Sequence, residues 1–199
     1  MTSIPITVKQ NIFKQGTQRW SPKGLCYQPQ DGVDPLCDDN LATLTHLLDP
    51  ATTYGLLNLG INCLRVYQVD PNKSHDKVMA LLAKHGIYVL VGTVNADTAI
   101  PRNATSVPAA TIARVKQVAD AFAGYDNVLG FSVANELLDA PDNGLVEIAK
   151  QVKQQMQTRD ARLRLRRCRY AHGFRRLQLL SLGGAARPAA DSWRHQRLL

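Results

Sequence analysis

The sequence predicts an α/β fold in which parallel strands alternate with helices, as in the first half of an eight-stranded (β/α)8 barrel of the TIM type. Between Lys23 and Phe131, short apolar runs alternate with segments of helical periodicity. A turn segment precedes the second, third and fourth of these runs. With 199 residues the chain is shorter than the roughly 250 of a complete barrel, so we expect only about the first four strand–helix units.

The first strand–helix unit begins at Gly24-Leu25-Cys26-Tyr27, a short and largely apolar run that polar loop residues follow. Residues 41–59 have the apolar spacing of a helix. Pro50 has to begin, end or kink a helix in that segment, because proline has no amide proton to donate. We therefore expect a strand at 24–27 and helical structure within 41–59.

The later units repeat one pattern, in which a helix stops at a turn and a buried strand follows. The turns are at 60–62, 86–87 and 125–127, and they lead into predicted strands at 63–67, 88–91 and 128–134. A helix is predicted up to Gly86 with Ser74 as its candidate cap, and another at 107–125 with Pro108 near its start. A fourth helix is predicted from Asn143 or Gly144 through Val152.

Charge divides the chain into two parts. Residues 1–158 contain 13 Lys and Arg against 14 Asp and Glu, whereas residues 159–199 contain 11 Arg, no Lys and 2 Asp. The net charge of +8 is therefore a property of the second part alone. We predict a folded region at 1–158 and, at 159–199, an Arg-rich tail that is not part of the fold.

Three interpretations of this tail are open. Phosphate contacts accept Lys as well as Arg, so the absence of Lys favours translation of an out-of-frame or mis-spliced segment. A selected basic tail that binds nucleic acid or a membrane surface is the second interpretation, although aromatic residues for base stacking are sparse. A divergent but genuine terminus is the third.

The sequence contains no pattern typical of a zinc site, a disulfide-rich domain or a membrane span. Its four cysteines, Cys26, Cys37, Cys63 and Cys168, have neither C-x-x-C spacing nor high density, which favours buried or incidental thiols. No apolar stretch reaches about 18 residues, and the first residues lack the charged and apolar regions of an export signal. From these residues we expect neither an export signal nor a membrane anchor.

The candidate catalytic residue follows the last predicted strand. The apolar run 128–134 ends at Asn135-Glu136, so a carboxyl group follows the carboxyl end of a buried strand, where barrel enzymes carry their active sites. Cleavage of a glycosidic bond with retention needs one protonated and one ionised carboxyl group, and sugar hydroxyls are held by hydrogen bonds. Glu136 and Asn135 fit one half of such a site. The alternative is a helix-capping Asn beside a solvated Glu.

Five segments give this pair a context. They lie at 5–13, 23–29, 59–70, 75–89 and 120–137. In order and spacing they resemble glycoside hydrolase family 72, the fungal cell-wall β-1,3-glucanosyltransferases, whose opening hairpin, strands and Asn-Glu pair they match in turn. The resemblance covers about residues 5–155 and implies the N-terminal half of a barrel-shaped catalytic domain.

The resemblance implies roles for four residues. Glu136 would be the general acid/base, and Asn135 its sugar-positioning neighbour. Tyr67 would offer an aromatic face or a hydroxyl group to a glucosyl ring, and Gln28 a hydrogen bond in the donor groove. The structural alternatives are a Tyr67 ring packed under a loop and a Gln28 without a binding role.

The chain also departs from the family at several points. Cys26 stands where the family usually has Asp, and Gly92 where an acidic residue typically ends the third strand. The family's nucleophilic Glu belongs to a later strand, beyond the start of the Arg-rich tail, and Glu147 falls on a predicted helix. We therefore expect these 199 residues alone to be nearly inactive and, with unpaired strand edges, prone to aggregation.

The mechanism that the resemblance implies is a retaining two-step transfer between β-1,3-glucan chains, without a metal or an organic cofactor. The expected partners are donor and acceptor glucan chains, and no specific nucleic acid. Family members act at the cell surface, either at the plasma membrane through a GPI anchor or in the cell wall, so membrane contact is expected only through such an anchor.

Three other functions are open. The first is another retaining β-glycosidase of the same barrel clan, which activity on β-1,4-linked substrates would distinguish. The second is a non-catalytic β-glucan-binding remnant. The third is a nucleic-acid binder that acts through its basic tail, whose affinity would fall steeply with salt.

Overall fold

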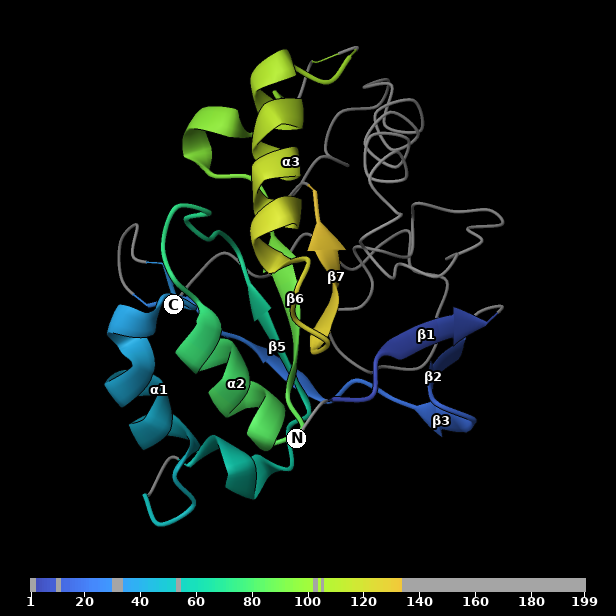
Figure 1. The fold of residues 1–199 in the computed structure, drawn as a ribbon, viewed down its shortest axis with the longest axis vertical. Coiled ribbons are helices and arrows are strands. Elements are labelled where there is room, and N and C mark those ends of the chain that lie inside the picture. Colours follow the sequence, from blue (N-terminus) through green and yellow to red (C-terminus); the bar gives the residue numbers. More distant parts are fainter. Residues whose placement is uncertain are drawn as a thin grey trace, which may run out of the picture.

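The structure, a computed structural model, describes residues 3–9, 12–29, 34–52, 55–101, 104 and 106–133 (Figure 1). The strands are β1 (Ile6–Lys9), β2 (Ile12–Gln15), β3 (Gln18–Trp20), β4 (Gly24–Cys26), β5 (Cys63–Val66), β6 (Tyr88–Gly92) and β7 (Val128–Ser132). The α-helices are α1 (Leu41–Leu48), α2 (Asp76–Lys84) and α3 (Ala109–Phe122), and the 3-10 turns are η1 (Asp38–Asn40), η2 (Leu56–Leu59) and η3 (Ala96–Thr98). The predicted helix from Asn143, the boundary at 158 and the tail at 159–199 lie outside the described residues.

Strands β4, β5, β6 and β7 form one parallel sheet in which each strand pairs with the next along the chain. One α-helix lies between each pair of consecutive strands, namely α1, α2 and α3. A parallel pair needs such a crossover, because its two strands run in the same direction. The sheet confirms the predicted α/β class and the positions of its four strands.

The main core lies between this sheet and the helices, which cover one of its faces (Figure 1). The sheet contributes Leu64, Val66, Val89 and Val91, and the helices contribute Leu44, Leu48, Val78, Met79, Leu82, Val118 and Phe122. Side chains alternate across a strand, so Arg65 of β5 and Leu90 of β6, which are register partners, lie on the opposite face. Both faces of the inner strands are therefore covered or half-buried.

The antiparallel sheet β1-β2-β3 contacts the amino-terminal end of β6 through Tyr88. The Tyr88 hydroxyl donates to the Ile4 carbonyl and accepts a 2.8 Å hydrogen bond from Gln15 Nε2. The Trp20 ring centroid lies 5.4 Å from that of Tyr88. The predicted opening hairpin is confirmed as β1 and β2, and β3 extends it without having been predicted. This sheet leaves the carboxyl ends of β5, β6 and β7 free to form a site.

The structure corrects the prediction that Ser74 caps helix α2. The residue at the N-cap is His75, and its side chain makes no capping bond. Instead Asp38, from η1, accepts hydrogen bonds from the amides of Lys77 (2.9 Å) and Val78 (3.1 Å) and from the Ser74 hydroxyl (2.7 Å). An ionised carboxylate is a stronger acceptor for the free amides of a helix start than a neutral hydroxyl.

Replacing Asp38 with Ala is expected to lower the free energy of unfolding by about 1 kcal/mol at pH 7, because α2 loses its cap. Desolvation raises the pKa of Asp38, but the hydrogen bonds from Ser74, Val78 and Lys77 outweigh it and hold that pKa below its ordinary value. A carboxyl group with a lowered pKa stabilises the fold above its unfolded pKa, and loses that effect as the pH falls through the folded pKa. Urea denaturation should therefore show a difference from wild type that shrinks below about pH 4.

Asp39 provides the matched control for this measurement. Its carboxylate is exposed and lies 3.4 Å from Lys73 Nζ in a surface ion pair. Asp39→Ala should change the free energy of unfolding by less than about 0.5 kcal/mol. Equal effects of the two substitutions would show that Asp38 does not cap α2.

Local signals explain the ends of the other helices. Helix α1 ends at Leu48, two residues before Pro50, and α3 begins directly after Pro108. These helices pack against the sheet. No helix in the described part of the chain is long and apolar enough to cross a membrane.

Candidate functional site

A cavity of about 300 Å³, which we call cavity 1, lies at the carboxyl ends of β5, β6 and β7. Its lining residues are Arg65, Val66, Tyr67, Gln68, Gly92, Val94, Asn95, Ala96, Ala99, Ile100 and Ser132. The topology explains why these residues lie together. Parallel strands end at the same edge of a sheet, and the loops that follow the strands meet at that edge. This is the edge at which α/β enzymes bind their ligands.

Tyr67 follows β5 directly and stands on the wall of cavity 1. Its residue surface is 39% exposed, so the ring is not packed under a loop. The Arg65 guanidinium carbon lies 4.6 Å from the ring centroid, in the geometry of a cation–π contact. Arg65 therefore orients the ring, which keeps part of its surface accessible to a ligand.

The structure brings Gln28 and Tyr67 together. Gln28 follows β4, and its Oε1 accepts a 3.3 Å hydrogen bond from the Tyr67 amide. The neighbouring Tyr27 amide donates to the Arg65 carbonyl at 2.8 Å, which extends the pairing of β4 with β5. Gln28 thus supports the backbone of the segment that carries Tyr67.

The other two predicted site residues, Asn135 and Glu136, lie outside the described residues. Strand β7 ends at Ser132, which lines cavity 1. In the sequence, Asn135 and Glu136 come three and four residues after Ser132.

Gly92 lines cavity 1, and the sequence analysis noted it only as a departure from the family. A Cβ atom at this position would lie 1.8 Å from the Tyr67 carbonyl oxygen and 2.3 Å from the carbonyl carbon. The end of β6 therefore approaches the end of β5 so closely that only glycine fits. An isolated glycine within an apolar strand is the sequence signal for such an approach.

The described lining of cavity 1 contains one formally charged side chain, Arg65, and no acidic one. The parallel sheet carries two thiols, Cys26 at the carboxyl end of β4 and Cys63 at the amino-terminal start of β5. Burial, with a smaller contribution from Cys26, raises the pKa of the Cys63 thiol to about 12, so it stays neutral. Cys26 is exposed. No group of three or more His, Cys, Asp or Glu residues in the described part could hold a metal ion.

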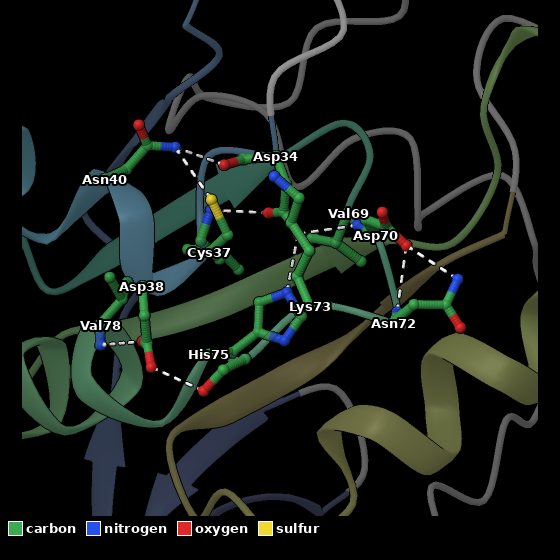
Figure 2. A network of polar contacts seen from close by, with 12 residues as sticks. Asp34, Cys37, Asp38, Asn40, Val69, Asp70, Asn72, Lys73, His75 and Val78 are labelled. Carbon is green, nitrogen blue, oxygen red and sulfur yellow. Dashed lines mark hydrogen bonds and ion pairs between the residues drawn. The ribbon is translucent and has the colours of Figure 1, made fainter.

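A second cavity of about 360 Å³, cavity 2, shares Gln68 and Asn95 with cavity 1. Its other lining residues are Asp34, Val69, Asp70, Asn72 and Arg114. Asp34 forms a buried pair with His75, whose Nε2 lies 2.7 Å from Asp34 Oδ2 (Figure 2). The sequence analysis missed this pair, because its members are 41 residues apart and belong to no local motif.

The glucanosyltransferase family, glycoside hydrolase family 72, matches residues 1–169. The chain belongs to this family. Family 72 accounts for the order of the hairpin, the parallel strands and the Asn-Glu pair along the sequence.

Curated relatives in family 72 come from several fungi. The 1,3-beta-glucanosyltransferase gel1 of Aspergillus fumigatus is 35% identical over 172 residues, which are 83% of this chain and 35% of the relative. The 1,3-beta-glucanosyltransferase GAS2 of Saccharomyces cerevisiae is 36% identical over 149 residues, which are 71% of this chain and 27% of the relative. The chain thus spans about a third of the length of these relatives.

Solved structures of the yeast protein Gas2 have the same fold. A complex with a compound designated 7 gives a TM-score of 0.68 at 29% identity, over 80% of this chain and 36% of that one. A complex of Gas2 with laminaritriose and laminaritetraose gives a TM-score of 0.65 at 29% identity, again over 80% of this chain and 36% of that one.

Proposed function

We propose that this protein is a 1,3-β-glucanosyltransferase that remodels the β-1,3-glucan of a fungal cell wall by a retaining two-step mechanism. Membership of family 72 carries this proposal, since the curated relatives are named 1,3-beta-glucanosyltransferases. Cavity 1 supports it, because an exposed tyrosine ring at the carboxyl edge of a parallel sheet suits a sugar. In this proposal the sheet β4-β5-β6-β7 forms the first four strands of an eight-stranded barrel.

In the proposed site, Glu136 is the general acid/base and Asn135 holds a sugar hydroxyl beside it. Glu136 protonates the leaving glucan oxygen while a nucleophilic carboxylate forms a glucosyl-enzyme, and it then deprotonates the 3-hydroxyl of the acceptor chain. The resemblance assigns the nucleophile to a strand later than β7. The end of β7 on the wall of cavity 1 supports the role of Glu136, because the carboxyl follows that end after only a few residues.

Two further residues are proposed to bind the donor glucan. The accessible ring of Tyr67 would stack on a glucosyl unit, with Arg65 fixing its orientation. Gln28, whose oxygen accepts from the Tyr67 amide, would contribute a hydrogen bond to the sugar in the donor groove. The chemistry needs no metal and no organic cofactor.

A second candidate function is glucan binding without transfer. It is favoured by Gly92, which has no room for the acidic side chain that is typical of the family at this position. The two candidates share the ligand and differ only in whether a bond is broken. We infer for both a location at the cell surface or in the wall, with membrane contact through a lipid anchor.

Incubation of the full chain with laminaritetraose tests the proposal. A transferase produces β-1,3-oligosaccharides longer than four units, which mass spectrometry detects, and calorimetry measures binding independently. Tyr67→Ala should weaken binding about tenfold, the value of one lost aromatic contact. Glu136→Gln should leave binding intact and reduce transfer at least a hundredfold, because the proton donor is removed.

Tyr125→Phe is the control, since the Tyr125 hydroxyl bonds Asp76 and does not line cavity 1. Longer products from wild type support the transferase, and binding without products supports the second candidate. No binding and no products would overturn both. Products that Glu136→Gln still forms at the wild-type rate would exclude Glu136 as the acid/base.

A further inference from the structure

Segment 67–70, which follows β5, forms part of the walls of both cavities through Tyr67, Gln68 and Asp70. Three of its backbone groups are bonded by side chains from three different parts of the chain. Gln28 accepts from the Tyr67 amide, Arg114 donates to the Val69 carbonyl, and Asp34 accepts from the Asp70 amide at 2.8 Å. Side chains, rather than a regular ladder, thus determine the path of this segment.

Asp34 is fixed in place by further bonds at the centre of this network (Figure 2). Its Oδ1 accepts from the Leu36 amide at 2.8 Å, and its Oδ2 accepts from His75 Nε2 as well as from Asp70. Asp34 is 5% exposed and His75 is 1% exposed. A buried carboxylate that three donors satisfy has little freedom to move, so it provides a rigid anchor for the Asp70 amide.

Helix α3 supports the same segment from another direction. Arg114 of α3 donates from Nη2 to the Val69 carbonyl, and in the part of the chain that the structure describes it has no carboxylate partner. Phe122 lies two turns later on α3, and its ring centroid is 4.5 Å from that of His75. Segment 67–70 is therefore linked to α3 in two ways. Arg114 bonds the Val69 carbonyl directly, and Asp34 bonds the Asp70 amide while its partner His75 packs against Phe122.

We propose that Asp34 and Arg114 are positioning residues of the glucan site, which hold segment 67–70 in one conformation so that Tyr67 and Gln68 face cavity 1. This inference rests on the proposed function. Neither residue lines cavity 1, so neither is expected to touch a sugar bound there. Their effect is to remove the ordering cost that a mobile segment would add to binding.

Hydrogen exchange and laminaritetraose affinity together test this role in the full chain. Arg114→Met removes the donor and keeps most of the stem, and Asp34→Ala removes the acceptor. Each should speed amide exchange across 67–70 at least tenfold and weaken laminaritetraose binding about tenfold. Arg114→Lys, which restores a charged donor, should recover most of both, which a loss of general packing would not explain. Lys116→Met, a loss of one charge on the same helix, should change neither quantity.

Unchanged exchange at 67–70 in Arg114→Met would overturn the proposal, even if Asp34→Ala does not fold. Faster exchange with unchanged affinity would also overturn it, since the segment would then be held without consequence for the sugar. If wild type binds no laminaritetraose, the proposed function fails and the positioning role falls with it. If amide exchange at 67–70 still depends on Arg114 in that case, the Arg114 bond stabilises the fold and has no role in sugar binding.

Discussion

Gly92→Asp is expected to lower the free energy of unfolding by about 4 kcal/mol, or to prevent folding, although an acidic residue is typical of the family at this strand end. The new Cβ atom would lie 1.8 Å from the Tyr67 carbonyl oxygen and 2.8 Å from the Val66 carbonyl oxygen. Both are backbone atoms, so no change of rotamer relieves the clash. Gly92→Ala should have nearly the same effect, because the overlap begins at Cβ. Urea denaturation followed by circular dichroism measures both.

Gly124→Ala is the matched control for this substitution. Gly124 follows helix α3, and a Cβ atom at this position would have no neighbouring atom within 4 Å. Its free energy of unfolding should change by less than about 0.5 kcal/mol. A Gly92→Ala protein as stable as wild type would contradict the close approach of β6 to the end of β5.

This close approach changes the meaning of the departure at position 92. Loss of a carboxylate alone could be reversed by one substitution, but here the backbone after β5 occupies the space that the side chain would need. Tyr67, whose carbonyl makes that contact, is also the exposed ring of cavity 1. The position of the proposed sugar-binding ring and the absence of a side chain at 92 are therefore coupled.

The sequence predicted the parallel sheet because its signals are local. Gly60 and Gly86 have φ angles of 64° and 68°, which suit glycine, and each ends a helical segment shortly before a strand. The cap of α2 could not be predicted in the same way. Asp38 and the amide of Val78 are 40 residues apart, so their contact depends on how α2 packs beside η1.

In the candidate site, too, the sequence indicated individual residues but not the contacts between distant segments. The resemblance to family 72 led to Tyr67, and the structure finds this residue on the wall of cavity 1, at the carboxyl ends of parallel strands where ligands bind. The bond from the Tyr67 amide to Gln28 and the pair of Asp34 with His75 join distant segments, and no spacing in the sequence indicates them. Roles for Asn135 and Glu136 stay predictions, since both lie outside the described residues.

Phe122→Ala is expected to lower the free energy of unfolding by about 4 kcal/mol, as large-to-small substitutions of buried aromatic residues do. Phe122 is 1% exposed and belongs to the main core. Its ring lies 4.5 Å from the His75 ring and 5.7 Å from the Tyr125 ring. Urea denaturation measures the loss. Phe13→Ala, which removes a half-buried ring from β2, should cost less than half as much, because less surface is buried there.

Phe122→Ala should also affect the proposed glucan site. The Phe122 ring packs against His75, and His75 bonds Asp34. A cycle of Phe122→Ala, His75→Ala and the double variant should give a coupling of about 1 kcal/mol, since the two rings share one contact. Additive effects would show that the rings act independently. If they are coupled, amide exchange at 67–70 should be faster in Phe122→Ala than in wild type, under conditions where the protein stays folded. The reason is that Asp34, which accepts from the Asp70 amide, is then held less firmly by His75. Stability of the core and order at cavity 1 would then depend on the same chain of contacts.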